Sequence, residues 1–153
     1  MFIRVSSVLP IPAPKLWRYL RRSASFRYVT FGLFGVKHRG RLPLVWEQGS
    51  RLVLDLTVLG FVPVWRQCIE IQEIDDKALS LRTNEHGGPF RSWRHSIQVR
   101  SIDASTSEYT DIVEFDVRHG SALFAFMLRR VFGYRHLRWR RLVKRMKART
   151  AHG

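Results

Sequence analysis

The sequence predicts an α+β fold in which an antiparallel sheet wraps around one long C-terminal helix and leaves a cavity between them. Apolar residues alternate with polar ones along most of residues 51–117, which is typical of strands with one buried face. Within residues 121–147 the apolar residues instead recur at helical spacing, and this stretch contains no proline and a single glycine. A meander with one apolar face needs a cover, and this helix is the only predicted element long enough to provide it.

The predicted C-terminal helix begins at Ser121, a good N-cap that follows Gly120. Its apolar stripe consists of Phe124, Leu128, Val131, Phe132, Trp139, Leu142, Val143 and Met146. Arg135 interrupts this stripe near its centre. A charge there must reach solvent, pair with a carboxylate or face a cavity, so Arg135 is the first candidate functional residue.

The N-terminal part is less regular. Residues 2–9 are rich in valine and isoleucine and predict a strand, and apolar residues at 13, 16, 17 and 20 predict a short amphipathic helix. Residues 23–49 have no clean period but contain glycines and several aromatic residues. A stretch of this length is usually functional or contains a small helix, and we expect an irregular lid or cavity rim that packs on the core. The aromatic residues could equally serve only to cover the core.

The rest of the predicted sheet follows as a meander. Its strands are expected at residues 51–58, 65–72, 78–83, 90–102 and 109–117, with turns at 60–63, 75–77 and 84–89. With the N-terminal strand, the sheet has six strands. Trp65 shares its predicted inner face with Gln67, Ile69 and Ile71.

Ionisable residues occupy predicted inner positions on the last two strands. His95 shares a face with Trp93, and Asp111 shares a face with Phe115. Because consecutive strands usually pair, His95 and Asp111 are expected to be neighbours, and Asp111 is the expected partner of Arg135. Two interpretations are open: an ion pair that locks the helix to the sheet, or a polar floor that orients a ligand in an apolar pocket.

Three motifs resemble those of uncharacterised bacterial members of the START-like superfamily, the SRPBCC or polyketide cyclase/dehydrase-like group. They are GGPFRSWRH at 87–95, YTDIVEF at 109–115 and YRHLRWRRL at 134–142. The resemblance implies a helix-grip fold, and it implies a polar-site role for Trp93, His95, Asp111, Arg135 and Tyr134. Ile97 stands where related members often have a second histidine, which argues against a two-histidine metal or acid–base site on this strand.

We therefore predict that the protein binds a small, mostly apolar ligand in an internal cavity: a lipid or a polycyclic or aromatic metabolite that can carry an acidic group. The predicted ligand-binding residues are Trp93, His95, Asp111, Arg135, Tyr134, Trp65 and Phe115. The first alternative is a cyclase- or dehydratase-type enzyme in which His95 and Asp111 provide acid–base catalysis. A non-enzymatic binding protein is the favoured interpretation, and no catalytic residue is assigned.

The charge is unevenly distributed. The chain has a net charge of +15, and the part from Ser121 onward contains ten lysines and arginines but no acidic residue. The second alternative is therefore a peripheral contact with an anionic membrane or, less favoured, nucleic acid. The expected anionic-surface residues are Arg138, Arg141, Lys144 and Arg145, although a merely solvated helix face would have the same composition.

Other classes of protein are disfavoured. Cys68 is the single cysteine, so no intramolecular disulfide can form. Arg4 and the prolines that follow it argue against a signal peptide, and no apolar stretch is long enough to span a bilayer. The six histidines are scattered, and we expect no metal and no cofactor. These features predict a cytoplasmic protein that can also associate with the membrane surface. The chain is expected to form one domain at 1–148, followed by a basic tail at 149–153.

Overall fold

The computed structural model describes residues 1–32, 34–58 and 62–151, and at 34–37 and 58 it describes the backbone alone. The strands are β1 (Phe2–Leu9), β2 (Phe34–Arg39), β3 (Arg51–Val58), β4 (Val62–Asp75), β5 (Ser80–Gly87), β6 (Phe90–Ser101) and β7 (Ser107–Val117). The helices are α1 (Ala13–Leu20), α2 (Ser23–Thr30) and α3 (Ser121–Ala151).

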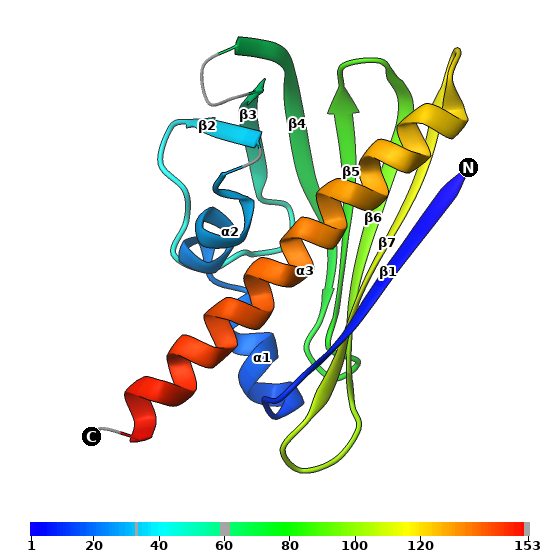
Figure 1. Cartoon of the computed structure of the whole chain (residues 1–153). Helices are drawn as coiled ribbons and strands as arrows, with labels where there is room; N and C mark the ends of the chain where they lie inside the picture. The colour runs from blue at the N-terminus through cyan, green and yellow to red at the C-terminus, as the bar shows by residue number, and fades with distance from the viewer. Residues whose placement is uncertain (33, 59–61, 152–153) are drawn as a thin grey trace.

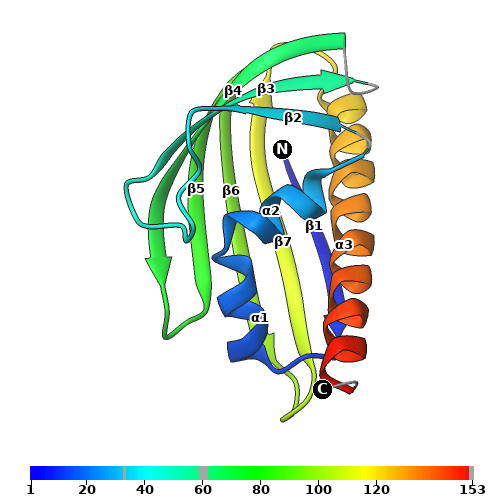
Figure 2. The ribbon, with the colours of Figure 1, turned by 90° about the vertical axis from the view of Figure 1, so that its left-hand side faces the viewer.

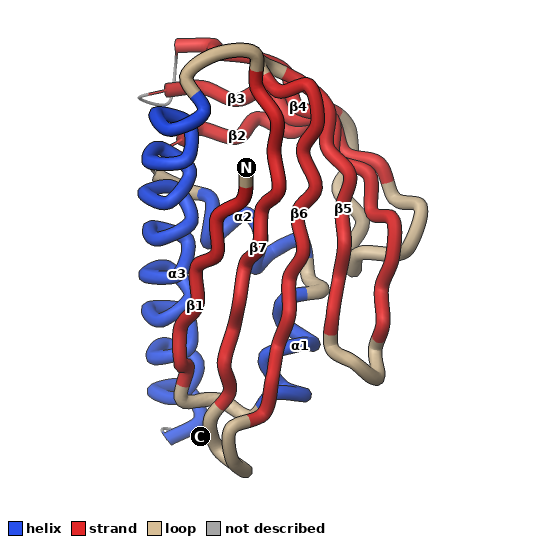
Figure 3. Tube along the Cα trace, turned by 90° about the vertical axis from the view of Figure 1, so that its right-hand side faces the viewer, coloured by secondary structure: helices blue, strands red, loops and turns tan. Residues whose placement is uncertain are grey.

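The strands form one antiparallel sheet in the order β1-β7-β6-β5-β4-β3-β2. From β2 to β7 each strand pairs with its neighbour in sequence, and β1 joins the edge beside β7. The sheet curves around α3, which crosses its concave side diagonally (Figure 1). The two short helices lie on the same side of the sheet as α3 (Figure 2), whereas no described helix covers the opposite face (Figure 3). The predicted helix-grip architecture is confirmed.

The details of two predicted irregular segments were wrong. Residues 23–49 are not irregular throughout. They contain the small helix α2, which is one of the two expectations for this stretch, and the unexpected strand β2, which gives the sheet seven strands instead of six. The predicted turn at 84–89 is also too long. Strand β5 continues to Gly87, because Glu85 pairs with Trp93 of β6 across the ladder, and only 88–89 remain in the turn.

Helix α3 is longer than predicted and is rotated slightly about its axis. It continues to Ala151, so most of the predicted basic tail is helical. Its buried residues are Ala125, Leu128, Phe132, His136, Trp139 and Val143. The buried stripe therefore centres on Phe132 and His136, with Arg135 at its border rather than in its middle. The predicted stripe contains only large apolar residues, whereas the buried face also includes Ala125 and His136, which explains the shift.

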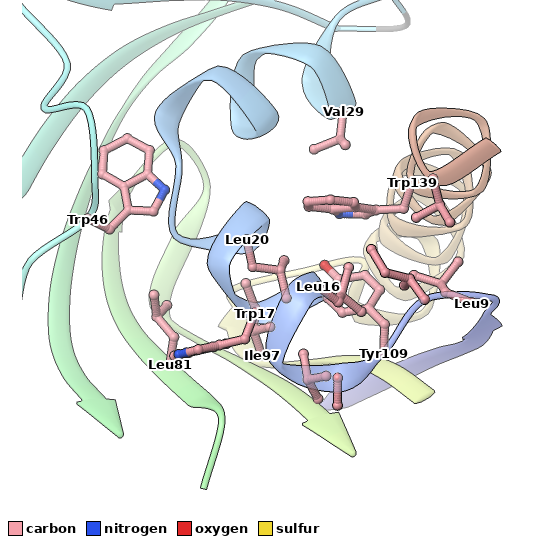
Figure 4. Close-up of a cluster of buried hydrophobic side chains, with 14 of the residues drawn as sticks. Leu9, Leu16, Trp17, Leu20, Val29, Trp46, Leu81, Ile97, Tyr109 and Trp139 are labelled. Atoms are coloured by element: carbon pink, nitrogen blue, oxygen red, sulfur yellow. The ribbon is translucent and has the colours of Figure 1, made fainter. Parts of the chain in front are cut away.

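Two apolar clusters make up the core. One joins α1, α2 and the C-terminal half of α3, where Trp139 lies beneath Val29 and above Leu16 and Tyr109 (Figure 4). The other joins β6, β7 and the N-terminal half of α3. A group of polar side chains lies where the two clusters meet. One of them is Tyr109, whose ring packs on Trp139 of the first cluster with ring centroids 5.9 Å apart.

Candidate functional site

Asp111 on β7 is the centre of a buried polar network. Its side chain is 1% exposed. His95 donates from Nε2 to Oδ1 over 2.7 Å, the Tyr109 hydroxyl donates to Oδ2 over 2.7 Å, and His136 donates from Nε2 to Oδ2 over 3.0 Å. The sheet brings these groups together because Ile97 of β6 lies opposite Asp111, which makes His95 a diagonal neighbour on the same face.

Arg135 completes this group from α3. Its Nη2 donates to the Tyr109 hydroxyl over 3.2 Å and lies 3.8 Å from Asp111 Oδ1. Its Nε is buried and has no hydrogen-bond partner among the described residues. Burial alone would raise the pKa of Asp111, but the charge of Arg135 and the hydrogen bonds from His136 and His95 hold it well below its usual value. Asp111 is therefore ionised, and the Nε donor of Arg135 has no acceptor in the described part of the chain.

Glu85 on β5 is a second buried carboxylate, which the sequence analysis missed. It accepts hydrogen bonds from Gln67 Nε2 over 3.1 Å and from the Thr83 hydroxyl over 3.0 Å. Its Oε1 lies 3.7 Å from His95 Nδ1. The alternation of Leu81, Thr83 and Glu85 could have revealed it, but the Asn-Glu-His-Gly-Gly-Pro composition favoured a turn.

His95 thus lies between two carboxylates. Burial alone would lower the pKa of His95, but its hydrogen bond with Asp111 and the nearby carboxylate of Glu85 outweigh that effect and raise the pKa above its ordinary value. Burial also raises the pKa of Tyr109 well above its usual value, so its hydroxyl stays protonated and serves as a donor.

His136 is the other residue that the sequence analysis missed. Its Nε2 contacts Asp111, and its Nδ1 lies 2.7 Å from the hydroxyl of Ser7 on the edge strand β1. The available signal was its place in the Tyr-Arg-His motif, next to Arg135. His136 therefore links α3, β7 and β1 through one side chain.

A cavity of about 180 Å³ lies between the sheet, the short helices and α3. Most of its wall is aliphatic and aromatic, with contributions from all three helices and from β3 to β6. Its polar wall includes Gln67, Thr83 and His95, which all contact Glu85, and Arg135, which is linked to His95 through Asp111. A mostly apolar pocket with a few convergent polar groups is the usual form of a small-molecule site.

The structure places the predicted ligand-binding residues in three positions. Trp93, His95, Tyr134 and Arg135 line the cavity. Asp111 lies behind His95 and Arg135 and holds them in place without reaching the wall.

The remaining two residues, Trp65 and Phe115, lie away from the cavity wall. Both pack around Phe90 in the second apolar cluster, with ring centroids 6.0 and 5.9 Å from it. They lie on inner faces as predicted from their alternation, but the residues of that cluster fill the space beside them.

The predicted anionic surface is divided. Arg141, Lys144 and Arg145 are exposed on α3. Arg138 is half-buried: its Nη2 donates to the Tyr28 carbonyl over 2.9 Å, and its guanidinium lies 4.1 Å from the centroid of the Tyr28 ring. Arg138 therefore ties α3 to α2.

The described residues contain no group of three or more histidine, cysteine or acidic side chains arranged to hold a metal ion. None of their helices is long and apolar enough to cross a membrane.

A protein family described as a domain of unknown function, DUF8410, matches residues 36–145. This chain belongs to the DUF8410 family. No curated protein matches it.

Solved structures match this DUF8410 chain over nearly its whole length. A START superfamily protein from Mycobacterium smegmatis has a TM-score of 0.71 and 9% identity, covering 95% of this chain and 98% of that one. Norcoclaurine synthase from Thalictrum flavum, in complex with dopamine and hydroxybenzaldehyde, has a TM-score of 0.72 and 12% identity, covering 95% of this chain and 87% of that one. A protein from Chromobacterium violaceum has a TM-score of 0.71 and 12% identity, covering 93% and 96%. The fold of the DUF8410 chain is thus the START/Bet v1-like helix grip.

Proposed function

We propose that this DUF8410 protein binds a single-ring aromatic molecule with a neutral hydroxyl group. The ring lies in the apolar part of the cavity, and the hydroxyl group lies against Glu85 and Arg135. The observation that carries the proposal is the polar wall. There Arg135, whose buried Nε has no hydrogen-bond partner in the described part of the chain, and the buried carboxylate of Glu85 line the same apolar cavity. A hydroxyl can accept from the first and donate to the second.

The cavity volume limits the size of the ligand. An apolar cavity of about 150 Å³ accommodates a benzene molecule. A volume of about 180 Å³ therefore suits one ring with a small substituent. It favours the aromatic metabolite of the sequence prediction over a lipid chain or a polycyclic compound.

The charges around the polar wall disfavour an ionised acid. Arg135 is already opposed by Asp111, and Glu85 adds a second negative charge. With His95 protonated, these four groups sum to zero, and a ligand carboxylate would leave an uncompensated negative charge in the core. The acidic group suggested by the sequence is therefore less suitable than a phenolic hydroxyl. The complex of norcoclaurine synthase with dopamine and hydroxybenzaldehyde supports the proposal, because both are single-ring compounds with hydroxyl groups.

Isothermal titration calorimetry with phenol, benzene and benzoate tests this proposal. We expect phenol to bind more tightly than benzene and benzoate to bind least. Glu85→Gln should weaken phenol binding by about tenfold, the cost of weakening one buried hydrogen bond. The control Glu114→Gln changes an exposed glutamate on the outer side of β7 and should leave binding unchanged. Equal affinity for the three probes, or no binding of any, would refute the proposal.

Acid–base catalysis is the second candidate, because the imidazole of His95 reaches the cavity and is held between Asp111 and Glu85. A neutral His95 could remove a proton next to a carbonyl group and return it. Acetophenone in deuterated water provides the test, since NMR reports the exchange of its methyl protons. If the protein is a catalyst, the wild type should make this exchange faster than it is in buffer alone. The variant His95→Gln should leave the exchange at the rate in buffer. Equal rates would leave binding alone as the function.

A further inference from the structure

We propose that the outer face of α3 docks on the surface of an anionic lipid membrane. This face consists of Leu123, Phe126, Arg130, Leu137, Arg141 and Lys144, all exposed. They follow one another at intervals of three, four or seven residues, which places them on one side of a helix. That side lies opposite the buried stripe of α3, and no described element covers it (Figure 2).

The apolar residues of this face are the first part of the argument. Leu123, Phe126 and Leu137 are 69%, 57% and 43% exposed. A single exposed leucine is ordinary, but three large apolar side chains aligned on one helix face call for an apolar environment in a partner. Arg130 lies over the ring of Phe126, with its guanidinium 5.1 Å from the ring centroid. An arginine beside such a ring can reach the headgroups while the ring enters the boundary of the acyl chains.

The charges of α3 are the second part. The helix carries ten basic residues and no acidic one, and eight of the ten are exposed: Arg129, Arg130, Arg140, Arg141, Lys144, Arg145, Lys147 and Arg149. The helix has 31 residues and is therefore about 46 Å long. Anionic headgroups can neutralise basic side chains along that whole length.

These features favour a membrane over other occupants. A second copy of the chain would bring two uniformly basic helices together, which like-charge repulsion opposes. Nucleic acid would satisfy the arginines but would leave the exposed leucine and phenylalanine side chains in water. A membrane surface accommodates both kinds of side chain. The cavity wall also includes Tyr134 and Val131 of the same helix, so docking would hold the cavity close to the lipid surface.

Vesicle flotation with the full chain tests the proposal, with phosphatidylglycerol vesicles compared with phosphatidylcholine vesicles. We expect binding to the first only. Changing Arg130, Arg141 and Lys144 to Gln should weaken it by about a hundredfold. A control that changes Lys77, Arg91 and Arg94 to Gln removes the same charge from exposed positions on the sheet side and should weaken it less than about threefold.

A second variant separates membrane insertion from general attraction. Changing Leu123, Phe126 and Leu137 to Gln keeps every charge and should weaken vesicle binding by about tenfold. Circular dichroism checks that each variant keeps its fold. Three outcomes overturn the proposal: full binding by this apolar variant, an equal loss in the control variant, or tighter binding to double-stranded RNA than to the vesicles.

Discussion

Asp111 keeps its charge in the core because donors surround it on all sides. His95, Tyr109 and His136 each donate one hydrogen bond, and Arg135 adds a positive charge 3.8 Å away. Removing one partner from such a group leaves a buried charge unpaired, which typically costs about 3–5 kcal/mol. The network is therefore a stabilising link between α3 and the sheet as well as the back wall of the proposed site.

A double-mutant cycle on Arg135 and Asp111 measures this link. Arg135→Met should lower the free energy of unfolding by about 3 kcal/mol, because it leaves Asp111 with less compensation. The double variant Arg135→Met with Asp111→Asn should lose less than the sum of the two single losses, as urea unfolding will show. The control pair Arg100→Met with Glu108→Gln joins an exposed arginine to a half-buried glutamate at the surface, and it should change stability by less than about 1 kcal/mol. Additive losses for the first pair would mean that the two charges do not interact.

The raised pKa of His95 makes a prediction about pH. A group whose pKa is raised in the folded state stabilises the protein fully below its unfolded value of about 6.5, and this contribution disappears as pH rises through the folded pKa. The free energy of unfolding should therefore fall as pH rises above about 6.5. Urea titrations at a series of pH values should show this slope in the wild type and in the exposed-site control His86→Gln, and not in His95→Gln. A flat profile in the wild type would contradict the proposed environment of His95.

At the scale of elements, α2 is held against α3 at two points. Arg138 donates to the Tyr28 carbonyl, and the Tyr134 hydroxyl donates to the Phe31 carbonyl over 2.8 Å. Gly32 follows with a φ of +122°, and a side chain there would collide with the Tyr134 hydroxyl. Because α2 and Tyr134 both contribute to the cavity wall, these contacts close one side of the proposed binding site.

Loosening this closure should be visible in hydrogen exchange. Tyr134→Phe removes the hydrogen bond to Phe31 and should speed amide exchange in α2 by about tenfold, without a comparable change in β6 and β7. Saturating phenol should slow exchange in α2 of the wild type. The control Tyr19→Phe on α1 should change neither. If α2 is as protected in Tyr134→Phe as in the wild type, its contact with Tyr134 does not control its opening.

The errors of sequence prediction also belong to this scale. Helix α2 has the sequence SASFRYVT, with few strong helix formers and no side-chain cap, so its helical state comes from packing rather than from propensity. Glu85 was missed because its surroundings read as a turn, although pairing with β6 continues the strand. His136 was missed because a hydrophobic pattern does not count a histidine, and Ala125 because the predicted stripe followed the large apolar residues. Each of these features is set by a neighbour that is distant in sequence.

At the scale of the whole molecule, the sequence was sufficient for the architecture. The two-residue period of the strands and the helical period of α3 each extend over many residues, so both predictions rest on many positions. A sheet with one apolar face and one long helix can pack together in only a few ways. The sequence also predicted that His95, Asp111 and Arg135 lie together, because each is a polar residue at a position where the pattern calls for an apolar one. The cavity volume could not be predicted, because it depends on how all the side chains in its wall pack.

Filling the cavity tests the central claim most directly. Leu54 is 2% exposed and lines the cavity, so Leu54→Trp should occupy part of its volume and leave the polar wall intact. Its matched control is Leu44→Trp, at a position that is 87% exposed. Calorimetry with phenol should show binding to the wild type and to Leu44→Trp, and no binding to Leu54→Trp that has kept its fold by circular dichroism. Equal phenol binding by all three proteins would place the ligand outside the cavity and contradict the account.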